Sequence, residues 1–334
     1  MTQSALSTDN RINSLLSSFK WGSEINGEPV TLTYSFPTTS STWITNYSGG
    51  EPFSPYGVAY LDNTQQQNVR NALQVWSSVA NISFIEVNDI EAQGDFRFTY
   101  SSAVDADGNT AAWAYLPSNT STAPEEAGDV WLSPQHSTNL EIGSDGFVTL
   151  IHEIGHALGL KHSFETENNS STTLSGTEDT TQYTVMSYTD YTGVGWQEES
   201  AGSFSTVKNT TIMPYDILTI QFLYGVNNTY HNEDNIYTFS NDTADFKTIW
   251  DTDGTDTFDL SNQTQAVTID LKSGAFNSIG LMQYEKIGNF IETTTKLAVD
   301  NIAIAYDVDI ENVIGGSGND SILGNHLNNE FTGN

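Results

Sequence analysis

Three of the chain's six histidines stand close together in the stretch HEIGHALGLKH. On an α-helix, His152 and His156 are one turn apart on the same face, so both imidazoles can bind a single metal ion. Glu153 is one step round the helix and can reach a water on that ion without being a ligand. Gly159 can end the helix in a left-handed turn, which brings His162 back as a third ligand. The spacing therefore predicts a metal site with its own general base.

The donor set favours zinc in a catalytic site. Structural zinc is enclosed by four protein ligands, usually including cysteine, whereas catalytic zinc has three protein ligands and an open position for water. The chain has no cysteine, so neither thiolate ligands nor disulfides contribute. A cluster of inert core histidines is the alternative interpretation. The remaining histidines have no partner at ligand spacing: His136, His231 and His326.

Two helices predicted from hydrophobic spacing lie on either side of several short strands. Residues 62–82 have apolar side chains at three- and four-residue steps, which predicts an amphipathic helix capped by Asp62 or Thr64. The histidine motif lies in a second, more apolar helix, with Ser144 or Asp145 as its N-cap. An α+β domain is the natural interpretation.

Short aromatic segments bounded by turn residues predict the strands of this domain: 82–87, 96–100, 111–116 and 129–133. A further helix is predicted over 215–225. We expect a mixed twisted sheet together with the helix that bears the histidines, all within residues 1–235.

Helical periodicity disappears after residue 235. Short β-prone runs there alternate with turns rich in Asp, Gly and Asn, which predicts an all-β domain over 236–334, built as a parallel β-roll or β-sandwich. The stretch GGSGNDSIL matches the nonapeptide Gly-Gly-x-Gly-x-Asp-x-U-x of calcium-binding β-helical repeats. Only one complete copy is present, so we expect this domain to be truncated.

The chain is strongly acidic, with 42 Asp and Glu against 10 Lys and Arg and a net charge of −32. This excludes a general electrostatic attraction to nucleic acid or anionic lipid, so we expect neither as a partner. The charge is explained by a solubilising surface, by carboxylates that coordinate Ca²⁺, or by both. The first thirty residues contain no apolar signal-peptide core, and no apolar run approaches the length needed to cross a membrane.

The histidine motif resembles a known family signature. HExxHxxGxxH is typical of metzincins, which also carry a methionine-containing turn beneath the zinc. Here YTVMSY supplies Met186. Its Met-Ser-Tyr form, together with LTYSFP, AAWAYLP, ILTIQFLYG, TDTFDLS and DIENVIGGSGND in the same order, makes nearly the whole chain similar to the serralysins. One departure is Ser163, which stands where serralysins usually have proline and matrixins have serine.

The resemblance implies a zinc metalloprotease domain over 1–235 and an RTX calcium-binding domain over 236–334. It implies one catalytic zinc, held by His152, His156 and His162. Glu153 is then the general base, and Met186 is a packing floor beneath the histidines. Tyr188 is expected to bind the zinc at rest and to move away during catalysis to stabilise the oxyanion.

The resemblance also implies how substrates bind. An extended peptide would pair as an added strand with the upper rim of the cleft, at Ala112, Trp113, Ala114 and Tyr115. Because main-chain pairing tolerates many sequences, we expect broad specificity on proteins and peptides. A proteinaceous inhibitor is a further expected partner, and the chain is expected to be a monomer. Its expected location is extracellular, as a bacterial protein secreted without a cleaved N-terminal signal peptide.

Acidic turns in the C-terminal third suit calcium, which takes six to eight oxygen ligands. Two or more structural calcium ions are expected. In a first site, the turn WDTDGTD supplies Asp251, Asp253 and Asp256, and by resemblance backbone carbonyls come from His231, Glu233 and Asn235. A second would combine Asp253, Gly254 and Asp256 with Asp309 and Glu311. A third would begin at Gly316, Gly318 and Asp320.

Two other functions stay open. The chain could be a calcium-dependent RTX binding or adhesion module with an idle protease-like head, although an intact zinc motif and methionine turn favour a working enzyme. It could also be a zinc enzyme that acts on a narrow, non-protein amide, since fold-level analogy does not determine the substrate.

Overall fold

The computed structural model describes residues 1–44, 47–53, 56–118, 126–197, 204–287 and 291–333. The chain forms two compact units. The first consists of Met1–Asp179, Val185–Ser187 and Tyr215–Asn227, and the second of Thr180–Thr184, Tyr188–Pro214 and Asn228–Asn334. The chain thus crosses between the units several times before residue 235, and the predicted division of functions at that residue stays a prediction.

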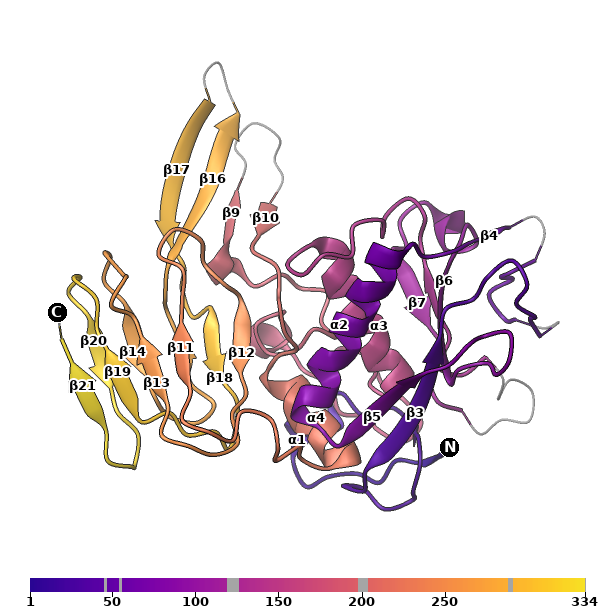
Figure 1. Cartoon of the computed structure of the whole chain (residues 1–334), viewed down its shortest axis with the longest axis horizontal. Helices are drawn as coiled ribbons and strands as arrows, with labels where there is room; N and C mark the ends of the chain where they lie inside the picture. Colours follow the sequence, from indigo (N-terminus) through magenta and orange to yellow (C-terminus); the bar gives the residue numbers. More distant parts are fainter. Residues whose placement is uncertain (45–46, 54–55, 119–125, 198–203, 288–290, 334) are drawn as a thin grey trace. The chain divides into compact units, whose positions relative to one another are not determined.

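A mixed, twisted sheet forms the framework of the first unit, as predicted (Figure 1). Its strands are β3 (Val30–Ser35), β4 (Val58–Ala59), β5 (Ile82–Glu86), β6 (Phe96–Ser101), β7 (Ala112–Ala114) and β8 (Val130–Leu132). They lie in the order β5-β3-β6-β8-β7, and β4 pairs with β6. β7 and β4 run antiparallel to their neighbours, and the other pairs are parallel. β1 (Thr2–Gln3) and β2 (Phe19–Lys20) form a small separate pair.

Four α-helices are described: α1 (Asn10–Asn13), α2 (Asn63–Val79), α3 (Asp145–Leu158) and α4 (Pro214–Tyr224). α2 begins with a capping box, in which Asp62 and Gln65 each bond to the other's backbone N–H, so the prediction of Asp62 as the cap is confirmed. Its apolar stripe packs on α3, where the Trp76 indole is fully buried and donates to the Ile151 carbonyl at 3.2 Å. Within the described residues, no helix combines the length and apolarity needed to cross a membrane.

The second unit is built from short strands, many of them parallel. One ladder has the order β11-β13-β19-β21 and is parallel throughout, and β12–β18 and β14–β20 are also parallel pairs. β15 pairs antiparallel with β18, and two antiparallel hairpins are formed by β9–β10 and β16–β17 (Figure 1). The bounds are β9 (Gly195–Gln197), β10 (Phe204–Thr206), β11 (Ile236–Thr238), β12 (Lys247–Ile249), β13 (Thr257–Asp259), β14 (Thr268–Asp270), β15 (Phe276–Asn277), β16 (Leu281–Ile287), β17 (Ile291–Leu297), β18 (Ile302–Ile304), β19 (Asn312–Ile314), β20 (Ser321–Leu323) and β21 (Glu330–Thr332).

Strand alternation explains the core of this unit. In the three-residue strands β13 and β19, the central Phe258 and Val313 are buried, while their neighbours are partly exposed. Parallel pairing puts these two side chains at the same level of the ladder. The arrangement is consistent with the expected all-β domain, and a β-roll in the strict sense stays a prediction.

Candidate metal centre

The local sequence determines where α3 begins and ends. Ser144 caps its first turn by accepting the Phe147 N–H at 3.1 Å. At its end, Gly159 has a φ of 106°, a left-handed conformation that L side chains rarely adopt. A Cβ at this position would also lie 2.7 Å from the Phe19 carbonyl oxygen. The predicted break at Gly159 is therefore confirmed, and it turns the chain back over the helix.

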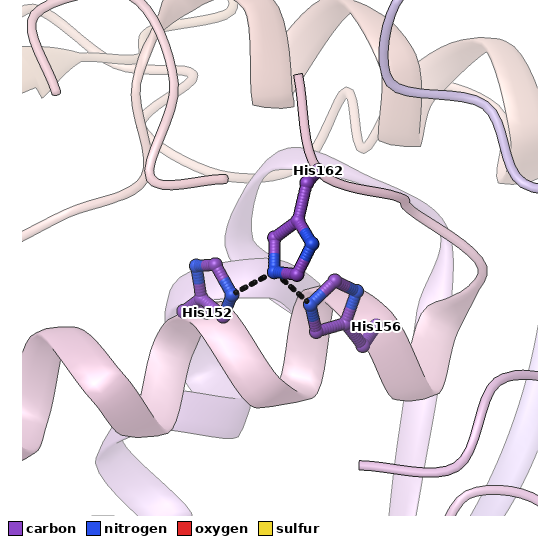
Figure 2. A group of neighbouring side chains, drawn as sticks. All are labelled: His152, His156 and His162. Atoms are coloured by element: carbon purple, nitrogen blue, oxygen red, sulfur yellow. Dashed lines mark hydrogen bonds between the residues drawn. The ribbon is translucent and has the colours of Figure 1, made fainter. Parts of the chain in front are cut away.

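This turn brings the three predicted histidines together. Figure 2 shows the rings of His152 and His156, both on α3, and that of His162 in the following loop, all pointing toward one another. The Nε2 of His162 lies 3.2 Å from that of His152 and 3.0 Å from that of His156. One potential ligand atom from each histidine lies within 4.8 Å of those of the other two. Among the residues that the structure describes, no other group of three or more His, Asp or Glu side chains meets this distance.

The Nδ1 atom of each histidine has its own neighbour. His152 Nδ1 lies 2.6 Å from the Val185 carbonyl, and His156 Nδ1 lies 2.8 Å from the Leu160 carbonyl. Because a carbonyl oxygen only accepts hydrogen bonds, both rings must carry their proton on Nδ1 and donate from it. The Nε2 atoms are then unprotonated, and each has a lone pair that can bind a metal ion. His162 Nδ1 instead lies 2.9 Å from the carboxylate of Glu165.

The protonation states also suit a metal. Burial lowers the pKa of His152 to about 4 and lowers the pKa of His156 well below its usual value. Both imidazoles are therefore neutral at pH 7, with lone pairs that converge on one point and would repel each other there. A cation between them removes that conflict. Three imidazole nitrogens without cysteine fit a catalytic zinc ion.

Glu153 lies on the same helix and is 5% exposed. Burial raises the pKa of its carboxyl to about 8, and a hydrogen bond from the Ala114 backbone N–H acts in the opposite direction. Its Oε2 atom is buried without a hydrogen-bond partner. A carboxylate with a free oxygen next to a water-activating ion is suited to take up a proton.

The predicted methionine floor is buried within the same unit as the histidines. A Cβ added at Gly155, within the zinc motif, would lie 2.8 Å from Met186 Sδ and 3.1 Å from the Trp76 ring. The glycine therefore allows helix, methionine and tryptophan to pack closely.

Sequence reasoning missed a buried carboxylate, Asp216 in the first turn of α4. Its Oδ2 accepts the Val185 N–H at 2.8 Å, and the carbonyl of that same residue contacts His152. Asp216 is fully buried and braces the peptide that orients a predicted zinc ligand. An acidic residue in the first turn of a helix was the available signal, but that position is also favoured by the helix dipole alone.

Ser163, the departure from the serralysin pattern, uses both of its polar groups. Its backbone N–H donates to the Met186 carbonyl at 3.4 Å, and its hydroxyl lies 2.6 Å from Asp179 Oδ1. Proline has neither donor. The loop after the third histidine is thus joined to the methionine turn by bonds that a proline there cannot make.

The same loop is also held by the N-terminal segment. Lys161 is buried, and its ammonium donates to the backbone carbonyls of Ser14, Glu165 and Thr172. Its backbone N–H donates to the Leu15 carbonyl at 2.8 Å. Burial lowers the pKa of this lysine to about 8.

Tyr188 belongs to the second compact unit, and its side chain is 70% exposed. Its expected role as zinc ligand and oxyanion donor stays a prediction. The expected substrate strand is present as β7, an edge strand whose described partner is β8 on one side. Ala112, Trp113 and Ala114 form β7 itself, and Tyr115 continues the pairing through its N–H to the Asp129 carbonyl at 3.0 Å.

Half of the predicted calcium residues, six of twelve, line one acidic cavity of the second unit. Its volume is about 230 Å³, and the lining residues are Asp251, Thr252, Asp253, Gly254, Asp256, Asp307, Asp309, Glu311 and Leu327. Burial, with the negative charges of Asp251 and Glu311 nearby, raises the pKa of Asp256 to about 7. Asp307, which has a φ of 62°, was not predicted. It alternates with Asp309 and Glu311 along the chain, and that spacing was a usable signal.

The other predicted calcium residues lie outside this cavity. The carbonyls of His231 and Asn235 accept backbone N–H groups from Thr252 at 3.1 Å and Thr257 at 2.9 Å. Glu233 lies against Gly254, where an added Cβ would be 2.4 Å from the Glu233 carbonyl oxygen.

In the predicted third site, Asp320 accepts the N–H groups of Val267 at 3.1 Å and Gly316 at 3.0 Å. An added Cβ on Gly318 would lie 2.5 Å from the backbone of Gln265. These residues brace neighbouring turns, and calcium at all three sites stays a prediction.

Comparison with known proteins agrees with this geometry. Residues 53–196 match the family model described as Matrixin, and residues 148–273 match the model described as Met-zincin. The chain is similar to a serralysin of Proteus mirabilis, with 34% identity over 92% of this chain and 62% of the relative. It is also similar to serralysin B of Dickeya chrysanthemi, with 31% identity over 90% of this chain and 60% of the relative.

A third relative is a metallopeptidase of Pseudomonas marginalis, with 32% identity over 91% of this chain and 62% of the relative. The chain therefore spans about three fifths of the length of these curated relatives.

Proposed function

We propose that this chain, which matches the Matrixin and Met-zincin family models and is similar to serralysins, is a zinc-dependent endopeptidase that hydrolyses peptide bonds in proteins. The observation that carries the proposal is the convergence of three imidazoles on α3 and the loop after it, with a buried carboxylate on the same helix that has a free oxygen. A purely structural metal site has no use for such a carboxylate.

His152, His156 and His162 would hold the ion through Nε2. When bound, zinc supplies Lewis acidity, which lowers the pKa of water to about 7 and polarises a carbonyl. The chain's own residues then do the remaining work. The two backbone carbonyls and the Glu165 carboxylate at the Nδ1 atoms keep the rings in place.

Glu153 takes the proton from the attacking water and delivers it to the nitrogen of the leaving amine. Its buried position on the helix that carries His152 and His156, with one oxygen free of other partners, supports this double role. Tyr188, by its place in the family motif, donates a hydrogen bond to the oxygen on which negative charge develops.

The outer edge of β7 binds the substrate as an added antiparallel strand. Its pairing with β8 is already complete, and the Ala114 N–H that points away from β8 is next to Glu153. Main-chain pairing gives little sequence selection, which supports broad specificity. Calcium stabilisation of the acidic cavity and secretion to the extracellular space are further parts of the proposal, supported by the cavity's carboxylates and by the similarity to serralysins.

Casein digestion tests this proposal directly. We expect the calcium-loaded chain to digest casein, 1,10-phenanthroline to abolish digestion, and added zinc to restore it. Glu153→Gln should lower the rate by roughly 10²- to 10⁴-fold with an unchanged zinc content, because only the base is lost. Glu141→Gln, which removes a charge from an exposed carboxylate ahead of α3, is the matched control and should digest at the wild-type rate.

The outcomes separate the alternatives. Digestion by Glu153→Gln at the wild-type rate would exclude this mechanism. A zinc-loaded wild type that digests neither casein nor peptides would favour the binding module or an enzyme for non-protein amides.

A further inference from the structure

A fully buried carboxylate, Glu51, contacts side chains of the proposed substrate strand. Its Oε1 accepts the Trp113 indole N–H at 2.9 Å and the Tyr115 hydroxyl at 2.6 Å. These two side chains alternate with Ala112 and Ala114, so they project from the same face of β7. One carboxylate oxygen therefore holds two side chains of one strand, Trp113 and Tyr115, which we call the anchors of β7.

The segment that carries Glu51 covers the back of the sheet at this point. We call residues 47–51 the backing segment. The Tyr47 hydroxyl bonds to Asp129, and the Gly49 N–H donates to the Tyr115 hydroxyl at 3.0 Å. Ser48 bonds to Glu126 through both its N–H and its hydroxyl, at 3.2 Å each. Tyr47 also belongs to a buried cluster with Val104 and Trp131, against which the Trp113 and Tyr115 side chains pack.

The strand that is held here has few restraints of its own. β7 is three residues long, and its outer-edge N–H and C=O groups are the ones proposed to pair with substrate. Its two alanines bury little surface, so Trp113 and Tyr115 carry most of its side-chain packing. A strand of this kind binds a peptide well only when it is ordered before the peptide arrives, because ordering it on binding reduces affinity.

We propose that Glu51 is a positioning residue that keeps β7 ordered for substrate pairing by holding Trp113 and Tyr115 from behind. This inference rests on the proposed endopeptidase function. It also connects the backing segment to the general base, since Ala114, between the two anchors, contacts Glu153 through its backbone N–H.

Steady-state kinetics on two peptides of different length test the proposal. The long peptide extends on both sides of the scissile bond and can pair along β7, whereas the short, blocked peptide cannot. We expect Glu51→Ala to raise KM for the long peptide by about fivefold, the order expected when one or two side chains must be ordered on binding. KM for the short peptide should change less than about twofold. Zinc content should not change.

Two substitutions serve as matched comparisons. Glu51→Gln keeps an oxygen that accepts from both anchors and should recover most of the affinity for the long peptide. Glu86→Ala removes a carboxylate of β5, at the opposite edge of the same sheet, which accepts the Tyr34 hydroxyl at 2.9 Å and the Arg70 guanidinium at 2.7 Å. It should leave KM for both peptides unchanged. An equal KM increase for Glu86→Ala, or an equal loss on both peptides for Glu51→Ala, would show that Glu51 acts only through general stability.

Milder variants cover the case in which Glu51→Ala does not fold. Trp113→Phe and Tyr115→Phe each remove one donor and keep an aromatic ring, so each should raise KM for the long peptide by about twofold. An unchanged KM in both would overturn the proposal.

If the wild type hydrolyses neither peptide, the proposed function fails, and hydrogen exchange still tests the role of Glu51. The β7 amides should exchange faster in Glu51→Ala than in Glu86→Ala. Equal exchange would overturn the inference.

Discussion

The two units contain two predicted cation sites, and these are built on opposite principles. In the first unit, neutral imidazoles converge, and burial holds the pKa values of His152 and His156 low. In the second, carboxylates from distant turns line one cavity, and Asp256 has a raised pKa because it is buried near other negative charges. Neutral ligands approach one another at little electrostatic cost, whereas charged ligands repel until an ion is bound.

This difference indicates what each ion contributes. The first site is held by contacts that do not involve the metal-binding Nε2 atoms, including the carbonyls of Val185 and Leu160 at the histidine Nδ1 atoms. We therefore expect zinc at the first site to contribute to catalysis more than to the free energy of unfolding. The acidic cavity has no comparable internal counter-charge among its lining residues. Calcium there should add stability.

The largest expected effect is the response of the second unit to calcium removal. Adding EGTA should lower the melting temperature and speed hydrogen exchange in β13 and β19, because each ion at a hundred times its Kd contributes about 2.7 kcal/mol. Exchange in α3 and the zinc content should change little. If α3 loosens as much as β13, the contrast between the units is wrong. Magnesium added in place of calcium is the control, since it dehydrates reluctantly and prefers smaller, octahedral sites.

A second prediction concerns the packing that holds the first site. Gly155→Ala places a methyl group against Met186 and Trp76, at distances that these side chains must move to relieve. We expect a loss of about 1–3 kcal/mol in the free energy of unfolding, measured by urea denaturation. Gly108→Ala is not a suitable control, because Gly108 has a positive φ. Gly57→Ala is suitable, since an added Cβ there meets nothing within 4 Å, and it should be nearly neutral.

A third prediction concerns the one zinc ligand that contacts a charged side chain. Glu165→Gln removes the negative charge beside His162 Nδ1, so this ligand becomes a weaker base. Zinc affinity, measured by chelator competition, should fall by about tenfold, at the lower end of the range for such partners. Glu141→Gln removes the same charge from an exposed position and should leave zinc affinity unchanged. Equal affinities of both variants would mean that Glu165 does not tune the site.

The smallest expected effect is a pH dependence of the calcium-free chain. The pKa of Asp256 is about 7 in the folded state and close to 3.8 without its surroundings. Between these values the folded chain holds a proton that the unfolded chain has lost, so stability falls as pH rises from about 4 to 7. Thermal melting in EGTA at pH 5 and 7.5 should show this. Asp256→Asn should reduce the slope, leaving the parts that come from Asp129 and Glu153, whose pKa values burial raises to about 8. An unchanged slope would contradict the assignment.

The sequence predicted those features that depend on local spacing. The histidine spacing, the cap at Ser144 and the turn at Gly159 involve residues a few positions apart, so helix geometry alone relates them. Short aromatic segments bounded by turn residues likewise predicted β7 and β8 to within two residues. These features follow from backbone geometry that neighbours in the sequence share.

Features formed by distant residues could not be predicted in this way. Glu51 contacts Trp113 and Tyr115, more than sixty positions along the chain, and no periodic pattern connects them. Asp216, on α4, accepts the N–H of Val185, which lies in a turn 31 positions earlier. Each is a buried carboxylate whose partner is a backbone or side-chain donor from another element, and composition gives no indication of which donor it will meet. The crossings between units before residue 235 arise from the same kind of long-range packing.

The contacts of Lys161 with residues 14 and 15 have a consequence for self-cleavage. Residues 22–25 and 27–29 are exposed, in the loop that connects this opening segment to β3. A single cut in that loop would leave the segment attached to the third histidine's loop by non-covalent bonds alone. Because Lys161 directly precedes His162, loss of the released peptide would remove contacts that hold the loop of one predicted zinc ligand. If the chain has the proposed endopeptidase activity, a cut in this loop would therefore lower that activity.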